Sequence, residues 1–176
     1  FQYSLHILDS PDAELRHVEY LHKDNSNPAA ALSKALRSQI GDSGSVVVWN
    51  MGFEKGCNDL AGLMLPEYTE FYNQLNERIV DLMTPFANGW YADKAFKGSA
   101  SIKNVLPVMV PDLSYKTLGI QEGMAAQRLW MEAVLDGARD NDKDKILADL
   151  LEYCKLDTLA MVEIYKRLTG IGEERG

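Results

Sequence analysis

The sequence predicts a single α/β domain in which a mixed β-sheet is flanked by helices. Three observations support this. The first 22 residues are rich in β-forming residues on both sides of a strong turn signal. A continuous apolar run, Val46–Trp49, is typical of a strand that is covered on both faces. The last third of the chain holds a long segment with apolar residues at helical spacing.

The first half of the chain alternates strand and helix patterns. Phe1–Leu8 and Leu15–His22 predict a hairpin, because Asp9–Asp12 (DSPD) separates them. Asn27-Pro28 opens a predicted helix that ends at Gly41, since Pro is favoured in the first helical turn. The remaining elements are two helices over residues 54–76 broken at Pro66, a strand Arg78–Met83, an irregular segment 85–114 with a short helix Ser101–Leu106, and helices Glu122–Leu135 and Asp142–Leu168, the last ended by Gly170.

Size and composition are those of an ordinary globular domain. With 176 residues, 46% hydrophobic and 25% charged, residues 1–176 suit one domain with a substantial core. The chain starts with Phe in strand-like sequence, so we expect a fragment from the C-terminal part of a longer protein. No apolar stretch reaches the roughly 18 residues of a membrane span, and we expect no signal peptide. Cys57 and Cys154 have neither metal-ligand spacing nor a disulfide framework around them, so we expect a cytoplasmic protein.

Charge is unevenly distributed. The formal net charge of −8 argues against binding of nucleic acid by overall attraction, but it leaves room for a local basic groove. Residues 94–128 carry five bases against two acids, whereas residues 132–157 carry eight acids against four bases. This contrast fits a basic binding surface, and it fits two solvated surfaces equally well.

Two carboxylates stand out by their positions. Helical spacing places Asp157 inside the apolar stripe of the long helix, one turn after Tyr153. A buried carboxylate is unfavourable unless it is paired, hydrogen-bonded or bound to a cation, so the alternative is an acid that forms a salt bridge at the edge of the stripe. Glu54 follows Asn50 just after the apolar run, where a first-turn acid also stabilises a helix dipole. Because ligand sites of α/β sheets lie at the carboxyl ends of strands, the two acids together predict a site for a hard divalent cation.

These residues resemble motifs of the DEDD-type 3′–5′ exonucleases, which have a ribonuclease H-like fold. Residues 50–54 (NMGFE) are similar to the second motif, Asn-x-x-Phe-Asp, and residues 153–157 (YCKLD) to the third motif of the tyrosine subgroup, Tyr-x-x-x-Asp. Residues 98–123 are similar to a bacterial family of such domains without known function, located at the C-terminal end of larger proteins. The resemblance covers essentially the whole chain.

The resemblance implies a function and a role for each matching residue. It implies hydrolysis of phosphodiester bonds in DNA or RNA, with single-stranded or 3′-end nucleic acid as substrate and two Mg²⁺ or Mn²⁺ ions held by four carboxylates. Glu54 and Asp157 would be metal ligands, and Tyr153 would orient the attacking water. The residues expected to contact the substrate are Asn50, Phe53, Lys97 and Lys103.

Two departures limit this expectation. Glu54 stands where the motif has Asp, and the longer side chain could make metal ligation indirect. The first motif, Asp-x-Glu on a central strand, is absent, because Asp12-Ala13-Glu14 lies in a turn after the wrong strand. Activity of this chain is therefore expected to be impaired, and a catalytically degenerate module that binds nucleic acid or a partner protein is the alternative. A missing central strand would also leave two sheet edges unpaired, which allows a homodimer through an exposed edge.

Other candidate groups are weaker. His17 and His22 point to opposite faces of a strand and do not converge on a metal. Asp81 ends its predicted strand and is expected to cap the structure there. Trp90, Tyr91 and Phe96 could stack on single-stranded bases or pack over the core, and the sequence does not choose between these.

Overall fold

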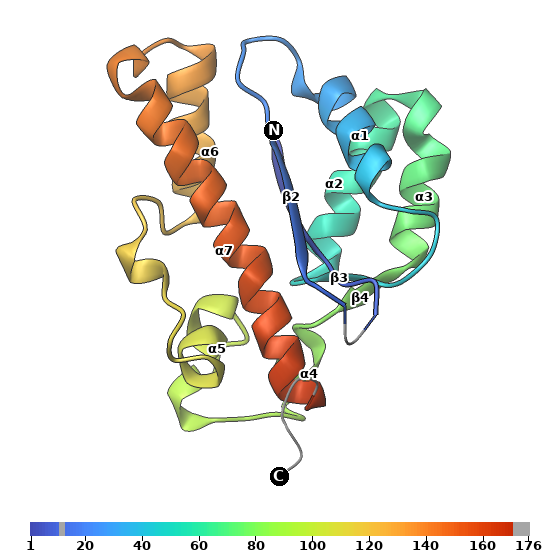
Figure 1. Ribbon diagram of the computed structural model, residues 1–176, viewed down its shortest axis with the longest axis vertical. Coiled ribbons are helices and arrows are strands. Elements are labelled where there is room, and N and C mark those ends of the chain that lie inside the picture. The colour runs from blue at the N-terminus through green and yellow to red at the C-terminus, as the bar shows by residue number, and fades with distance from the viewer. Residues whose placement is uncertain (11–12, 171–176) are drawn as a thin grey trace.

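The structure is a computed structural model that describes residues 1–10 and 13–170. Its first element is the predicted hairpin, in which β1 (Gln2–Ile7) pairs antiparallel with β2 (Arg16–Leu21) (Figure 1). The register places Gln2 opposite Leu21 and Ile7 opposite Arg16. Asp12, the first residue of the rejected Asp-x-Glu candidate, lies outside the described residues.

The next segment builds a second pair of strands and three helices. Asn27 Oδ1 accepts the backbone N–H of Ala29 and so caps α1 (Pro28–Gln39). The apolar run forms β3 (Val46–Val48) and leads into α2 (Met51–Met64). As predicted, the chain breaks at Pro66 before α3 (Thr69–Glu77), and β4 (Ile79–Asp81) then pairs parallel with β3.

The strands form two small sheets instead of the single mixed sheet that the sequence predicts. The antiparallel sheet holds β1 and β2, and the parallel sheet holds β3 and β4. Within residues 1–10 and 13–170 no strand joins the outer edge of β1 to the outer edge of β3. For the same reason Val46–Val48 is half-buried, whereas the sequence predicts full cover on both faces. The fold class is α/β.

The second half of the chain is helical and wraps around one long helix. It comprises α4 (Thr84–Ala87), α5 (Ile102–Met109), α6 (Gly123–Trp130) continued by a π-helical turn (Met131–Leu135), and α7 (Lys143–Thr169). Gly170 ends α7 with a φ of 67°, a left-handed conformation that glycine adopts without strain. Among the helices described, none has both the length and the apolar character needed to cross a bilayer.

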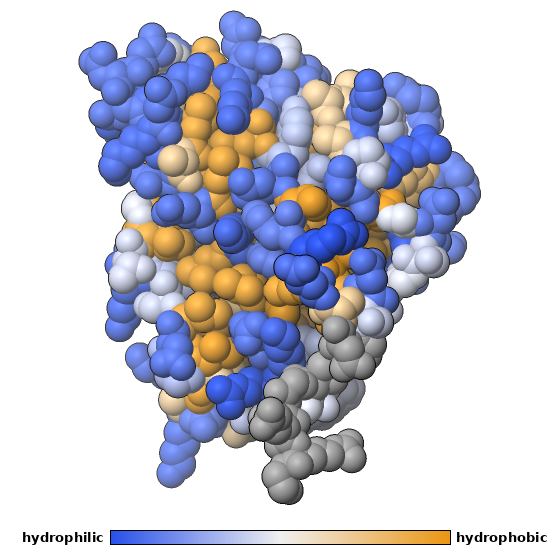
Figure 2. Space-filling view, viewed as in Figure 1, coloured by the Kyte–Doolittle hydropathy of each residue, from blue (hydrophilic) through white to orange (hydrophobic). Residues whose placement is uncertain are grey.

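The core lies on both sides of the strands. The larger part surrounds α7, whose Leu150, Ala160 and Ile164 are fully buried, and includes residues of α5 and α6. A smaller part joins α1 and α3 through Leu36, Tyr72 and Leu75. Figure 1 shows α7 crossing the molecule diagonally beside the hairpin, with α1, α2 and α3 on the other side. On the face drawn in Figure 2, apolar side chains gather along the middle and hydrophilic ones lie toward the margins.

A polar cluster connects the hairpin to α7. Thr158 Oγ1 lies 2.9 Å from Ser4 Oγ and 2.8 Å from His6 Nδ1. Ser4 Oγ also lies 2.9 Å from His17 Nε2 on the neighbouring strand. Burial, with His17 as a second cause, lowers the pKa of His6 to about 4. The folded chain therefore favours the neutral form of His6 in this cluster.

Acidification is expected to weaken this contact. Because the pKa of His6 is lower in the folded chain than in the unfolded chain, its contribution to stability is present above about pH 6.5 and is lost as the pH falls toward 4. Because the ring is partly exposed and solvent screens its charge, the maximum loss is about 1–2 kcal/mol. The test is urea unfolding of wild type and His6→Asn at pH 7.5 and pH 4.5. Asn keeps a polar atom near Thr158 but does not titrate, so the free energy of unfolding should fall less between the two pH values in the variant than in wild type. Equal losses in both proteins would contradict the assignment.

Candidate functional site

The corner after β3 is held by a carboxylate from β4. Asp81 Oδ1 accepts the backbone N–H groups of Asn50 (3.1 Å) and Met83 (2.9 Å), and Asp81 Oδ2 accepts that of Met51 (2.9 Å). Asp81 is thus the structural cap that the sequence predicts. Asn50 has a left-handed backbone, with φ of 76°, and its Oδ1 caps α2 by accepting the N–H of Phe53. This geometry starts α2 directly at the carboxyl end of β3.

Glu54 lies in the first turn of α2, close to Asp157 of α7. Both side chains are half-buried. Burial raises the pKa of Glu54 from its usual value, and the negative charge of Asp157 raises it further. Folding therefore places the two carboxyl groups that the sequence singles out near enough for their charges to interact, although 102 residues lie between them along the chain. A bound cation would offset the repulsion between these two half-buried carboxylates.

Asp157 is held by polar neighbours. Tyr115 O–H donates a hydrogen bond of 2.6 Å to Asp157 Oδ1. Burial raises the pKa of Asp157, whereas hydrogen bonding from Tyr115 and Tyr153 and the charge of Lys103 oppose that rise. The carboxylate in turn raises the pKa values of both tyrosines, after burial as the main cause, so both phenols stay protonated and act as donors at neutral pH.

Each predicted site residue has a definite position. Tyr153 is buried, with its ring 6.1 Å from that of Tyr115. Lys103 lies in the first turn of α5 and acts electrostatically on Asp157. Phe53 is 64% exposed on α2, and Lys97, with a left-handed backbone, is exposed in the loop before α5. The structure thus groups Glu54, Tyr153, Asp157 and Lys103, with Asn50 at the adjacent helix cap.

The aromatic residues of the loop divide into two kinds. Phe96 is buried and packs against Phe86, with ring centroids 5.7 Å apart. Trp90 is 73% exposed and Tyr91 is 42% exposed. The packing interpretation is therefore correct for Phe96 and in part for Tyr91, whose ring lies 5.7 Å from that of Phe86. Stacking on bases stays a prediction for Trp90 and for the exposed part of Tyr91.

The sequence patterns do not indicate that Tyr115 bonds to Asp157 or that the loop before α5 is tied to the end of β3. Tyr115 comes from a short 3₁₀ turn in an irregular region without helical or strand periodicity, so no pattern marks its phenol as a partner of Asp157. Trp49 Nε1 donates to the carbonyl of Ala100 (3.1 Å), which ties the loop before α5 to the end of β3. A Trp at the end of an apolar strand was the available signal, since its buried N–H requires an acceptor.

The residues present fit a divalent cation only in part. Carboxylate oxygens are the ligands that Mg²⁺ and Mn²⁺ prefer, and Mg²⁺ commonly binds through one or two carboxylates together with water and substrate phosphates. Glu54 and Asp157 provide such a pair. In the part of the chain that the structure describes, no group of three or more His, Cys, Asp or Glu side chains converges on a possible metal position. The pair suits one weakly held cation and does not by itself provide a two-metal site.

Comparisons with known proteins place the chain in a family. The chain is 30% identical over 131 residues to "Uncharacterized protein MG366" of Mycoplasma genitalium, covering 68% of this chain and 20% of that protein. It is also 30% identical over 141 residues to the MG366 homolog of Mycoplasma pneumoniae, covering 74% and 21%. It therefore spans about a fifth of the length of these relatives. No solved structure matches the chain. Residues 1–101 match the family model described as "Domain of unknown function (DUF2779)", and the chain belongs to this family.

Proposed function

We propose that the chain is a ribonuclease H-like domain of a metal-dependent 3′–5′ exonuclease that hydrolyses phosphodiester bonds of DNA or RNA. The observation that carries the proposal is the approach of Glu54 and Asp157 from two distant elements, with raised pKa values for both carboxyls. Perturbed carboxyl pairs occur preferentially at functional sites. The free cysteines, Cys57 and Cys154, are in keeping with a cytoplasmic protein.

Each residue has a proposed task. Glu54 and Asp157 hold the cation, and Tyr115 fixes the orientation of the Asp157 carboxylate. Bound Mg²⁺ or Mn²⁺ would supply an activated water and stabilise the leaving 3′ oxygen. Tyr153, protonated and one turn from Asp157, orients the attacking water, and Lys103 attracts the phosphate. Asn50, Phe53 and Lys97 contact the nucleotide at the 3′ end.

Degradation of a labelled oligonucleotide tests the proposal. The chain would be incubated with single-stranded DNA and RNA carrying a 5′ fluorophore, with Mg²⁺, Mn²⁺ or EDTA. We expect products that shorten from the 3′ end, slowly and only with a cation, and no products from Asp157→Ala. Tyr115→Phe should lower the rate by about 10- to 100-fold, the usual effect of removing an outer-shell partner. Cleavage that persists in EDTA or in Asp157→Ala would refute the assignment.

A catalytically degenerate module that binds nucleic acid or a protein is the second candidate. It is favoured by the lack, among the described residues, of a third metal-ligating side chain beside Glu54 and Asp157. Fluorescence anisotropy with the same oligonucleotides separates the two functions. Binding that is unchanged by EDTA and by Asp157→Ala, without cleavage in any cation, would favour the module over the enzyme.

A further inference from the structure

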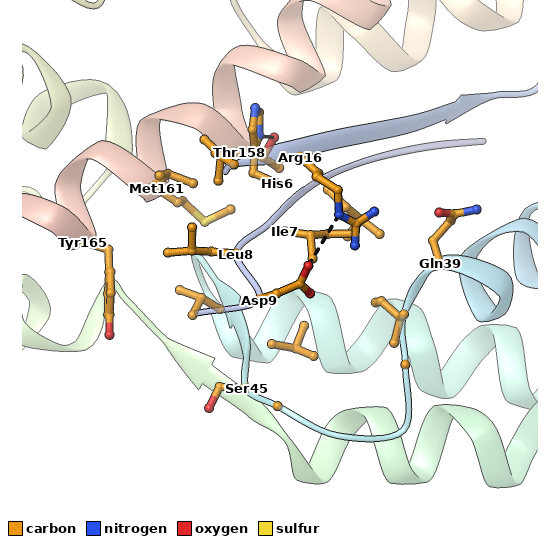
Figure 3. Close-up of a pocket in the computed structure, with 18 of the residues that line it drawn as sticks. His6, Ile7, Leu8, Asp9, Arg16, Gln39, Ser45, Thr158, Met161 and Tyr165 are labelled. Atoms are coloured by element: carbon orange, nitrogen blue, oxygen red, sulfur yellow. Dashed lines mark hydrogen bonds and ion pairs between the residues drawn. The ribbon is translucent and has the colours of Figure 1, made fainter. Parts of the chain in front are cut away.

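A groove lies between the two small sheets. It has a volume of about 780 Å³. It is lined by Leu5–Ser10 of β1 and the following turn, by Ser45 and the first two residues of β3, and by Thr158, Met161, Val162 and Tyr165 of α7. Figure 3 shows Leu8 and Met161 on the left, Gln39 on the right and Ser45 below, with the ion pair of Asp9 and Arg16 (3.6 Å) between Leu8 and Gln39. We call this cavity the inter-sheet groove. It is separate from the carboxylate pair, although Thr158 follows Asp157 directly.

The strands on both sides present unused backbone groups to the inter-sheet groove. His22 N–H donates to Phe1 C=O, so in this antiparallel pair the odd-numbered residues of β1 bond to β2. The N–H and C=O groups of Ser4 and His6 consequently point away from β2. On the other side, Val46 N–H bonds to Arg78 C=O and Val48 C=O accepts from Leu82 N–H, which leaves the N–H and C=O groups of Val47 directed away from β4. Of these residues, His6 on one side and Val47 on the other line the same cavity.

The walls above and below the free edges are largely apolar. Val47 and Met161 pack at the edge of the core around α7, whereas Leu5, Ile40 and Val46 pack against the smaller core of α1 and α3. An occupant would therefore meet apolar side chains on both faces. A residue of a packed strand takes up about 4.8 Å between strands, 3.3 Å along the strand and 10 Å between layers, or roughly 160 Å³. The groove volume thus corresponds to about five residues in extended conformation.

We propose that the inter-sheet groove accepts an extended polypeptide segment from outside residues 1–176, which inserts as a strand between β1 and β3 and joins the two sheets. An added strand forms hydrogen bonds with the free backbone groups of both edges at once. A small molecule of this volume would bond to fewer of these groups. A relative such as the matched Mycoplasma genitalium protein is long enough to supply such a segment, because four fifths of it lies outside the aligned part. Unpaired edges that face each other are an arrangement that native proteins avoid.

The lining also specifies the chemistry of the strand. Its central residues must be apolar on both faces, in contrast to the alternating pattern of a strand with one solvated face. Among the acidic and basic residues of the lining, the bases Arg16, Arg78 and Lys166 outnumber the single acid, Asp9. The strand should therefore carry acidic residues near its ends. Pairing with both edges requires free N–H groups, so proline is excluded from its centre.

Hydrogen exchange of the 176-residue chain in the presence of a synthetic strand tests the proposal. The probe is the peptide ESVVVVVSE, at a concentration on the order of 1 mM. We expect the amides of His6 and Val47 to exchange about tenfold more slowly, because each gains a hydrogen bond. The peptide ESVPVPVSE, in which proline removes the N–H donors on either side of the central valine, should have no effect, and KSVVVVVSK should act more weakly. Unchanged exchange with ESVVVVVSE, or equal protection by the proline peptide, would overturn the proposal.

A pair of matched variants shows whether the inter-sheet groove is the binding place. Met161→Arg places a charge in the groove and should abolish protection, whereas Met124→Arg introduces the same residue at an 86% exposed position on α6 and should not. Circular dichroism confirms that both variants fold. Sedimentation without peptide tests whether a second copy of the chain fills the inter-sheet groove instead. If the wild type is a dimer and Met161→Arg is a monomer, a second copy is the occupant and the proposed donor segment is wrong. Nuclease activity is not used in any of these measurements, so their outcome is independent of the proposed function.

Discussion

Replacing Asp157 by Asn is expected to raise the stability of the chain at neutral pH and to abolish any stabilisation by Mn²⁺. In the folded chain the pKa values of Asp157 and Glu54 are raised, so folding favours their protonated forms. Asn removes the charge but leaves an oxygen that can accept the hydrogen bond from Tyr115. We expect a gain on the order of 1 kcal/mol, as is usual when a strained functional residue is replaced by a neutral one. For a domain of this size that corresponds to about 2–4 °C in Tm.

The sign of the pH dependence follows from linkage. A carboxyl whose pKa is higher in the folded state binds more protons there. Its contribution to stability is therefore present below the ordinary carboxyl pKa and is lost as the pH rises from that value through the raised pKa of the folded state. The advantage of Asp157→Asn should therefore be small near pH 4 and should grow toward pH 7. Scanning calorimetry of both proteins at several pH values measures this difference. A constant difference over that range would contradict the raised pKa.

Mn²⁺ provides the second part of the same test. If the pair binds the cation with a Kd of about 1 mM, then about 10 mM Mn²⁺ adds roughly 1.4 kcal/mol to the stability of the wild type. Neither Asp157→Asn nor Glu54→Gln should show this gain. Asp149→Asn is a suitable control, because Asp149 lies on the same helix but pairs with Lys145 at 3.2 Å. A gain of equal size in all four proteins would show that the cation acts elsewhere.

Truncating Trp130 to Ala is expected to destabilise the chain by about 3–5 kcal/mol. Trp130 is 5% exposed, its ring stacks on Phe1 at 4.6 Å, and its Nε1–H donates to the carbonyl of His22 at 2.8 Å. One side chain of α6 thus contacts the residue before β1 and the residue after β2, which lie opposite each other at the open end of the hairpin. The loss combines the apolar contacts, the cavity that is left, and a buried carbonyl without its donor. Compared with the 5–15 kcal/mol of a typical domain, this is a large fraction of the total.

Two variants separate these contributions in denaturant unfolding. Trp130→Phe keeps an aromatic ring beside Phe1 and removes the hydrogen bond, so it should lose less than the Ala variant. Trp90→Ala removes the same side chain from a 73% exposed position and should change stability by no more than about 0.5 kcal/mol. A small effect of Trp130→Ala would mean that the hairpin is held mainly by the polar cluster around Thr158.

Local patterns in the sequence were sufficient for most elements. The turn residues between two β-rich runs, Asn27 at a helix start and Gly170 at a helix end act through neighbours only a few positions away, so their outcomes agree with the prediction. The sheet differs because strand pairing is decided by contacts distant in the chain. Val46–Val48 is apolar enough for a central strand, yet it pairs with β4 alone and leaves its other edge on the inter-sheet groove.

By itself the sequence determined where the two acids sit: Glu54 in the first turn after an apolar strand, and Asp157 on the apolar stripe of a long helix. Only the tertiary structure decided that the charges of the two acids interact and that Tyr115 from an irregular segment donates to Asp157. It also decided that Asp81 caps the corner from which α2 starts. The physical reason is range. Periodicity and capping are short-range properties that a sequence displays directly, whereas the meeting of two carboxyl groups depends on how α2, α5 and α7 pack around a shared core.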